Sequence, residues 1–282
     1  MPRADRARSR CATSAPNRDD PHSAPLPDSR RADSLSEMGS TGSNWSDGQG
    51  AADIYAALSA LRTHLGELQL PQVAHGRRAI ILFEGPAGSG KKAALKQLAA
   101  SFDPCHYAVH CTGYDRREAS DGHWLARFWR QLPSAGNTSI FFRSWYRRAL
   151  DDRILGRTDE QGVARVFDEI NEFEAQQRDY GTLILKLYFT VSADVQRERL
   201  AERSAAPWRE PGRDEPALVD DAAYTRAFND LRSHSDTRWS PWRVIDGDNE
   251  EQAAMAALEA IADAWSKAMP SEPPHLIRPA VA

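Results

Sequence analysis

The sequence is poor in cysteine, in lysine and in long apolar runs, and each shortage excludes a class of protein. Three cysteines in 282 residues are too few, and odd in number, for a disulfide framework, which favours a reducing, cytoplasmic compartment. No run reaches the roughly 18 to 20 consecutive apolar residues that a membrane span needs, so a membrane protein is excluded. Only five of the 36 basic residues are lysines, and the formal net charge of -4 argues against a general nucleic-acid coat.

The first 50 residues also lack isoleucine, valine, phenylalanine and tyrosine. Serine, proline, arginine and aspartate dominate this stretch, which therefore cannot bury enough apolar surface to offset its ordering entropy. We predict a disordered tail over 1–50, or an over-extended start with Met38 as the true first residue. The folded domain is predicted over 51–268, and the proline-rich stretch 269–282 is predicted to be a second tail.

Beyond the first tail, short apolar segments alternate with longer helical ones. The segments AIILF and LILKLYF are apolar on both faces, which is typical of a parallel sheet covered on both sides. The first helix is amphipathic from Ile54 to Leu68 and is expected to end before Pro71. The pattern predicts a three-layer α/β domain. The expected strands are Ala79–Phe83, His106–Cys111, Ser139–Phe142, Leu183–Phe189 and Trp242–Ile245, and the other expected helices are Lys91–Ser101, Gly122–Leu132, Val163–Tyr180, Ala193–Arg203, Pro216–His234 and Glu250–Lys267.

A glycine-rich loop follows the strand AIILF and precedes an Ala/Leu-rich helix. It reads EGPAGSGKK from Glu84 to Lys92 and fits the G-x-x-x-x-G-K core of a phosphate-binding loop. In such a loop backbone N–H groups turn inward around an anion, the helix N-terminus adds partial positive charge, and Lys91 reaches the terminal phosphates. Lys92 occupies the position of the usual magnesium-ligating Ser or Thr, which indicates a variant family. The predicted phosphate- and nucleotide-binding residues are Gly85, Gly88, Ser89, Gly90, Lys91 and Lys92.

A second motif, FFRSWYRR at Phe141–Arg148, resembles the segment F-D-R-S-W-Y-N-R of the polyphosphate kinase type 2 family. That family also carries L-F-E-G-R-D-A-A-G-K-G at its phosphate loop, matched here by Leu82–Gly85, Gly90 and Lys91. Further matches extend the resemblance over about 77–262. The run RFWRQLP, with FFxSWY, is most similar to the amino-terminal, catalytically degenerate half of two-domain polyphosphate:AMP phosphotransferases. The resemblance implies a P-loop kinase-like fold with a five-stranded parallel sheet and a helical lid.

The resemblance also implies an activity, namely phosphoryl transfer between inorganic polyphosphate and nucleoside mono- or diphosphates, with Mg²⁺ as cofactor. Lys91 and Arg143 are the expected catalytic residues. The family's metal-holding aspartates correspond to Ala87 and Phe142, and Glu84 is a weak substitute for them. Polyphosphate and lid contacts are expected from Arg147, Arg148, Arg153 and Lys186.

The replaced aspartates leave a second function open. The alternative is a catalytically inactive family member that binds polyphosphate or nucleotide and acts as a partner or regulator. The expected partners are polyphosphate and nucleotide, with no nucleic acid and no membrane. A homo-oligomer is expected, or a mixed oligomer with an active paralogue.

Three further features allow two interpretations each. The arginines between Arg143 and Arg165 are either an anion-binding lid or an ordinary solvated basic face. Lys186 lies inside an apolar strand, where an unpaired ammonium would be costly, so it either pairs with a buried acid or reaches a ligand. His123 and Trp124 either pack in the core or form a stacking site for a nucleobase.

Overall fold

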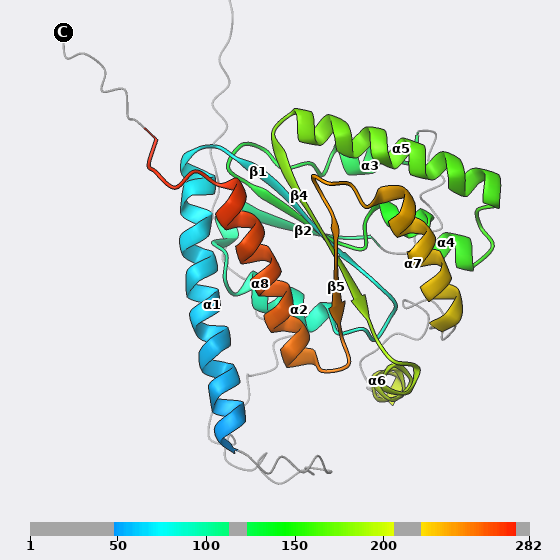
Figure 1. Ribbon diagram of the computed structural model, residues 1–282, viewed down its shortest axis with the longest axis horizontal. Coiled ribbons are helices and arrows are strands. Elements are labelled where there is room, and N and C mark those ends of the chain that lie inside the picture. The colour runs from blue at the N-terminus through cyan, green and yellow to red at the C-terminus, as the bar shows by residue number, and fades with distance from the viewer. Residues whose placement is uncertain (1–47, 113–122, 206–220, 275–282) are drawn as a thin grey trace, which may run out of the picture. The chain divides into compact units, whose positions relative to one another are not determined.

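The structure, a computed structural model, describes residues 48–112, 123–205 and 221–274. Five parallel strands form one sheet in the order β2-β3-β1-β4-β5 (Figure 1). This confirms the predicted fold class, and every predicted strand is found within one residue of its expected ends. The predicted tail over 1–50 lies outside the described residues except for 48–50, which begin the first helix. The strands are β1 Arg78–Glu84, β2 Tyr107–Cys111, β3 Thr138–Phe142, β4 Thr182–Thr190 and β5 Trp242–Asp246.

Strand β1 lies at the centre of the sheet and is buried on both faces. Ile81 is opposite Ile140 of β3 and Leu185 of β4. Because successive side chains of a strand point to opposite faces, Ile81 contributes to one apolar cluster and Ile80 and Leu82 to another. The two-sided apolar pattern of the sequence therefore corresponds to two cores, one on each face of the sheet.

The connections between the strands are mostly helical, and no described helix is long and apolar enough to cross a membrane. Helix α5 begins before the predicted Val163 because the side chain of Asp159 caps it, accepting a hydrogen bond from the Gly162 N–H at 2.7 Å. Residues 216–220, the predicted start of the helix Pro216–His234, lie outside the described residues. The bounds are α1 Gly48–Ala74, α2 Lys91–Ala99, η2 Pro104–His106, α3 Ala126–Trp129, η4 Trp145–Arg148, α4 Asp151–Ile154, α5 Glu160–Asp179, α6 Ala193–Ala205, α7 Asp221–Ser235 and α8 Glu250–Ala268.

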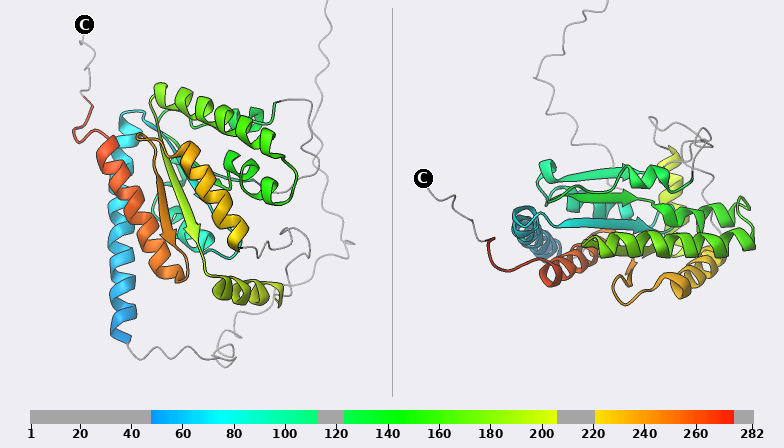
Figure 2. Two further views of the ribbon diagram at one scale, coloured as in Figure 1. Left: turned by 45° about the vertical axis from the view of Figure 1, so that its right-hand side comes forward. Right: turned by 90° about the horizontal axis from the view of Figure 1, so that it is seen from above.

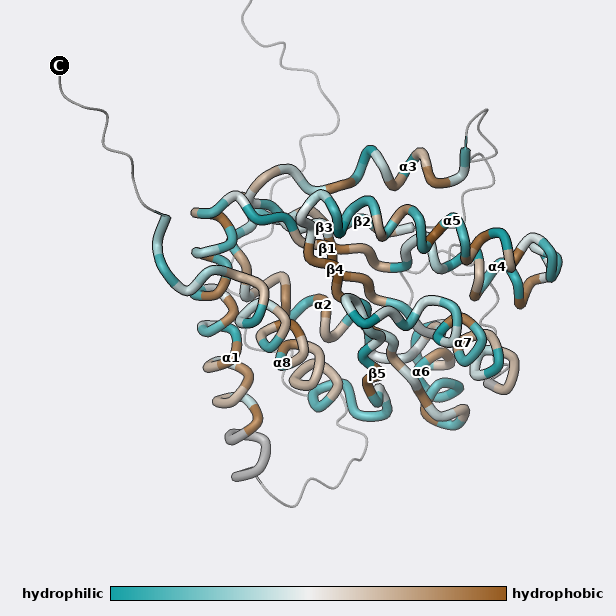
Figure 3. Tube along the Cα trace, turned by 45° about the horizontal axis from the view of Figure 1, so that its top comes forward, coloured by the Kyte–Doolittle hydropathy of each residue, from teal (hydrophilic) through white to brown (hydrophobic). Residues whose placement is uncertain are grey.

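Helices cover both faces of the sheet. Leu65 of α1, Leu98 of α2 and Leu258 of α8 pack in the cluster that contains Ile81. On the other face, α5, α7 and η4 pack in the second cluster. Figures 1 and 2 show α1, α2 and α8 on one side of the strands and α5 and α7 on the other, and Figure 3 shows the hydrophobic central strands between them. The domain therefore has the three predicted layers.

Helix α1 runs through Pro71, so the prediction that it ends before this residue is wrong. The carbonyl of Pro71 still accepts the N–H of His75 at 3.0 Å. The last turn is held by the buried side chain of Gln72, which donates to Thr138 Oγ1 and accepts from Trp265 Nε1, each at 2.9 Å. These tertiary hydrogen bonds outweigh the loss of one helical hydrogen bond at a proline.

The helix predicted over Gly122–Leu132 is reduced to the four residues of α3, and its first residue lies outside the described part. Aromatic contacts fix this short segment together with a few backbone hydrogen bonds, such as that from the Trp129 N–H to the carbonyl of Leu125 at 3.2 Å. Phe128 packs edge-on against Phe141 and Trp145, and Trp129 packs edge-on against Phe173. The aromatic spacing that predicted a long helix therefore reflects packing against β3 and α5.

Candidate phosphate-binding site

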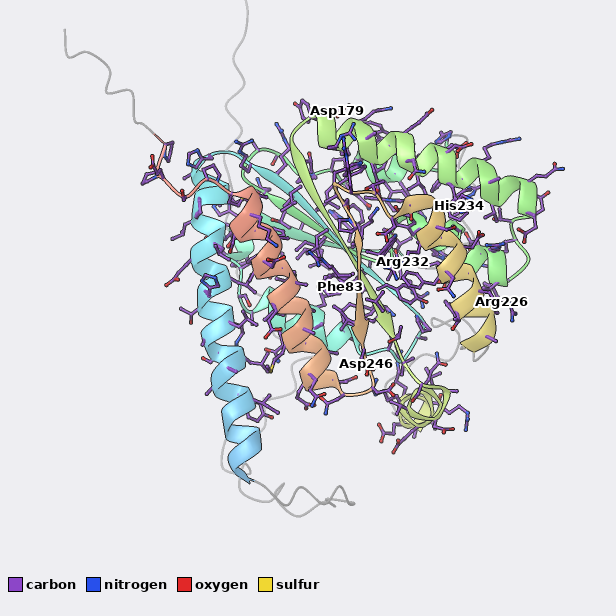
Figure 4. All side chains as sticks on the ribbon, in the orientation of Figure 1. Phe83, Asp179, Arg226, Arg232, His234 and Asp246 are labelled. Carbon is purple, nitrogen blue, oxygen red and sulfur yellow. The ribbon has the colours of Figure 1, made fainter. Side chains whose placement is uncertain are left out.

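The glycine-rich loop joins the carboxyl end of β1 to the start of α2. In Figure 4 Asp246, the last residue of the parallel strand β5, marks this carboxyl edge of the sheet. Gly85 has a φ of 130°, and a Cβ there would lie 2.2 Å from the carbonyl oxygen of Phe189. Gly90 caps α2 with a φ of 77°. The loop therefore requires glycine both for its backbone angles and for its contact with β4.

Lys91 is the first residue of α2, and its side chain turns back into the loop. It is 4% exposed, and its ammonium donates to the carbonyls of Gly85 and Pro86 at 2.7 and 2.6 Å and to Ser89 Oγ at 3.0 Å. Burial and, to a lesser degree, the charge of Arg143 lower the pKa of Lys91 to about 7. Lys92, the neighbouring residue, is exposed. The loop thus holds the ammonium of Lys91 among its own acceptors, and the contact of Lys91 with phosphates stays a prediction.

Helix α6 fixes the loop from outside. Gln196 Nε2 donates to the carbonyl of Ala87 at 2.7 Å. Arg199 donates to the carbonyls of Gly88 and Gly247 at 2.9 and 2.7 Å, and to that of Asp248 at 2.7 Å. Sequence reasoning did not identify this role, although the i, i+3 spacing of Gln196 and Arg199 places both side chains on one helix face. The carbonyls of Ala87 and Gly88 therefore point toward α6, whereas those of Gly85 and Pro86 accept from Lys91.

Glu84, the last residue of β1, connects this strand to the segment after β3. Its Oε1 accepts hydrogen bonds from the backbone N–H and the hydroxyl of Ser144, both at 2.6 Å. Burial raises the pKa of Glu84 to about 7, although the hydrogen bonds from Ser144 oppose this shift. Lys91 and Glu84 are thus two ionisable groups buried beside the same loop.

Arg143 follows β3 in a left-handed backbone conformation with a φ of 63°, which is uncommon for a residue other than glycine. Its N–H donates to the carbonyl of Phe83 at 3.1 Å. Its guanidinium pairs with Asp151 Oδ2 at 3.2 Å, and the hydroxyl of Tyr224 donates to the other oxygen of Asp151. The strained backbone directs Arg143 toward the phosphate loop, where its charge acts on Lys91.

The other arginines of the predicted lid differ in their partners. Arg147 lies 3.4 Å from Asp152, and Arg153 pairs with Glu160 at 2.8 Å and with Asp230. The guanidinium of Arg148 instead lies over the ring of Trp124, 5.1 Å from its centroid, and has no ion pair with a described residue. The segment is therefore neither a plain solvated face nor a uniform row of available cations.

Comparison with known proteins identifies the family. Residues 50–273 match the family described as Polyphosphate kinase 2. The chain belongs to this family. Among polyphosphate kinase 2 relatives, a polyphosphate:AMP phosphotransferase of Pseudomonas syringae pv. tomato is 31% identical over 195 residues, which are 67% of this chain and 39% of that protein. ADP-polyphosphate phosphotransferase 2 of Rhizobium meliloti is 27% identical over 210 residues, 73% of this chain and 69% of that protein.

Solved structures agree with the polyphosphate kinase 2 assignment. Polyphosphate kinase 2 from Arthrobacter aurescens TC1 matches with a TM-score of 0.70 and 26% identity, covering 82% of this chain and 87% of that one. A second structure, from Pseudomonas aeruginosa PA01, matches with a TM-score of 0.71 and 28% identity, covering 76% of this chain and 48% of that one. The chain spans about two fifths of the length of the polyphosphate:AMP phosphotransferases that it matches.

One side chain predicted for this polyphosphate kinase 2 site lies elsewhere. Lys186 is fully buried in β4, and its ammonium donates to Glu174 Oε2 at 3.1 Å, to the carbonyl of Ser235 at 2.7 Å and to the hydroxyl of Tyr146 at 3.3 Å. Of the two alternatives, pairing with a buried acid is therefore the one observed. The sequence could not identify Glu174 because it lies on a different element, α5.

The carboxylates near the loop do not fit the metal site that polyphosphate kinase 2 resemblance implies. Ala87 and Phe142, at the two expected positions, have no side-chain oxygen. Glu84 Oε1 accepts two hydrogen bonds from Ser144, and both oxygens of Asp151 are engaged. Across the described ranges, no three His, Cys, Asp or Glu side chains form a group that could hold a metal ion. We assign no ligand to Mg²⁺.

Proposed function

We propose that this polyphosphate kinase 2 family member transfers a phosphoryl group between inorganic polyphosphate and a nucleoside mono- or diphosphate. The observation that supports this most is the position of Lys91, whose ammonium lies inside the loop beside Arg143. Relatives with matching sequence are named as phosphotransferases for AMP, ADP and GDP. Phosphoryl transfer depends chiefly on positioning and on stabilising negative charge, and both cations serve that need.

In this proposal each group has a role at the phosphates. When a phosphate enters the loop, its oxygens replace the carbonyls and the hydroxyl that now accept hydrogen bonds from Lys91. Because the pKa of the free Lys91 is about 7, a bound anion favours its protonated form. Arg143 supplies a planar, permanently charged partner for phosphate oxygens. Among the lid residues, Arg148 is available without breaking an ion pair to a described acid, whereas Arg147 and Arg153 are not.

A second candidate function is binding of polyphosphate or nucleotide without turnover, alone or in a mixed oligomer with an active paralogue. The specific observation in its favour is Phe142, at one of the two positions where the resemblance implies a metal-holding aspartate. Its ring centroid lies 5.8 Å from Lys91 Nζ, so an apolar group faces the ammonium there. Mg²⁺ is expected from the resemblance alone.

The experiment that separates the two functions measures transfer and binding on one preparation. Purified protein is incubated with polyphosphate, Mg²⁺ and each of AMP, ADP, GMP and GDP, and product nucleotides are separated by chromatography. We expect turnover that Lys91→Ala abolishes and that the matched surface variant Lys96→Ala retains. If the wild-type protein shows no turnover but holds labelled polyphosphate on a filter, the result supports the second function, binding without turnover.

Two further outcomes complete this test. If the wild-type protein has no transfer activity and the double variant Ala87→Asp/Phe142→Asp gains it, the missing activity is due to the residues at these two positions. A protein that binds neither polyphosphate nor nucleotide at low salt contradicts both functions, because electrostatic binding to a polyanion is strongest there.

A further inference from the structure

A hollow of about 330 Å³ lies between the segment that leads into α3, the first three turns of α5, and η4. Its walls include His123 and Trp124 on the first segment, Arg148 on η4, and Arg165 and Glu169 on α5. These side chains combine two guanidinium groups, two flat rings and one carboxylate. The phosphate loop does not contribute to these walls.

The two arginines give the hollow a surplus of positive charge. Neither Arg148 nor Arg165 has an ion pair within the described part of the chain, whereas Arg143, Arg147, Arg153 and Arg157 each face an acid. Arg148 Nε is buried and has no hydrogen-bond acceptor. A buried donor without a partner is costly, and the guanidinium that carries it lines the hollow without a neutralising acid among the described residues.

The rings and the carboxylate line another part of the hollow, where the guanidinium of Arg148 lies over the ring of Trp124. The rings of His123 and Trp124 stack at a centroid distance of 6.1 Å with an interplanar angle of 30°. Trp124 Nε1 donates to Glu169 Oε2, which fixes the indole, and Glu169 Oε1 lies 3.8 Å from His123 Nε2. An ionised carboxylate only accepts hydrogen bonds, so this wall suits a flat ring that carries an amino group.

We propose that this hollow binds a nucleoside monophosphate, with its phosphate on Arg148 and Arg165 and its base against His123 and Trp124. Glu169 accepts a hydrogen bond from the amino group of the base. The hollow is within the volume range of small-molecule sites, which is about 300–1,000 Å³. This inference rests on the proposed function, because it assigns a place to the nucleotide of that reaction. Arg148 lies five residues after Arg143 in the sequence, on the segment that follows β3.

Titration calorimetry of the full chain tests the proposal, with AMP, adenosine and ribose 5-phosphate as ligands. We expect AMP to bind about tenfold or more tightly than either fragment, because each fragment lacks one of the two contacts. Arg165→Ala removes an exposed side chain and is expected to weaken AMP binding about tenfold, as is Arg148→Ala. The matched control is Arg178→Ala on the same helix, which removes an equal charge far from the hollow and is expected to leave AMP binding unchanged.

Three outcomes decide between the proposals. AMP binding that survives both Arg148→Ala and Arg165→Ala overturns the assignment of the hollow, whatever the enzyme activity. Binding that is lost in these variants and kept in Lys91→Ala supports it, even if polyphosphate transfer fails in every preparation. Ribose 5-phosphate that binds as tightly as AMP also contradicts the proposal, since the hollow would then be a simple anion site.

Discussion

At the scale of single residues, the phosphate loop carries two ionisable groups whose burial shifts their pKa toward neutrality. Lys91 and Glu84 each have a pKa of about 7. The folded protein therefore disfavours the charged form of both, and each must affect stability in its own pH range. The glycine-rich sequence predicted that Lys91 faces the loop, but the hydrogen bonds between Glu84 and Ser144 depend on a contact across 60 residues.

We expect the Glu84 carboxyl to make the free energy of unfolding depend on pH. Its pKa is raised in the folded state, so the folded protein binds more protons between pH 4.5 and 7, and stability falls as the pH rises through this range. Relative to Glu84→Gln, the wild type should lose roughly 3 kcal/mol between these limits. Urea unfolding at several pH values measures this difference. The exposed Glu251→Gln should retain the wild-type slope, and parallel curves for wild type and Glu84→Gln would contradict the assignment.

At the scale of elements, two side-chain networks join segments that are distant in the sequence. Lys186 connects β4 to α5 through Glu174 and to the end of α7 through the carbonyl of Ser235. Arg199 connects α6 to the phosphate loop and to the turn between β5 and α8. Neither network follows from hydrophobic periodicity, because the partners lie on different elements and their pairing depends on the final packing.

Removing Lys186 is expected to destabilise the fold strongly. Lys186→Met leaves the fully buried Glu174 without its charged partner, which typically costs about 3–5 kcal/mol. Adding Glu174→Gln should recover part of this loss. Urea unfolding of the two variants, with the exposed Lys267→Met as control, checks both statements. If Lys186→Met is as stable as Lys267→Met, the pair contributes nothing to stability.

Removing Arg199 is expected to weaken phosphate binding more than it weakens the fold. Arg199→Ala frees the carbonyls of Gly88 and Gly247, so the loop loses a fixed shape, and polyphosphate affinity should fall about tenfold. A filter-binding titration measures the affinity. Arg197→Ala, on the solvent side of the same helix, should bind as the wild type does. A loss of equal size in both variants would mean that the net charge of α6 matters and its contacts with the loop do not.

At the scale of the whole molecule, the sequence predicted the layers, the order of elements and the strands better than the ends of the helices. Strands that are apolar on both faces, such as β1, are typical of a parallel sheet covered on both sides, so the fold class could be predicted from the pattern of apolar segments. The continuation of α1 through Pro71 could not be predicted, because it depends on Gln72 reaching Thr138 and Trp265. The hydrogen bond from Tyr224 to Asp151 could not be predicted either, since Tyr224 lies 73 residues further along the chain.

The family match begins at residue 50, and residues 1–50 lack isoleucine, valine, phenylalanine and tyrosine, so residues 1–46 are expected to be dispensable for folding. Deleting residues 1–46 should change the melting temperature by no more than about 2 °C, since less than about 0.5 kcal/mol is lost. Deleting residues 1–65 also removes Leu58 and Leu65, which are buried, and should lower it by about 10 °C or prevent folding. Calorimetry of both truncated chains gives the answer, and equal melting temperatures would contradict it.

The contacts from α6 to the loop have a consequence for re-engineering. Gln196 contacts the backbone carbonyl of Ala87, so this contact does not require a particular side chain at position 87. We therefore expect position 87 to accept polar residues while the backbone of the loop keeps its conformation. A library of substitutions at Ala87 would vary the chemistry presented to a phosphate without rebuilding the loop that presents it.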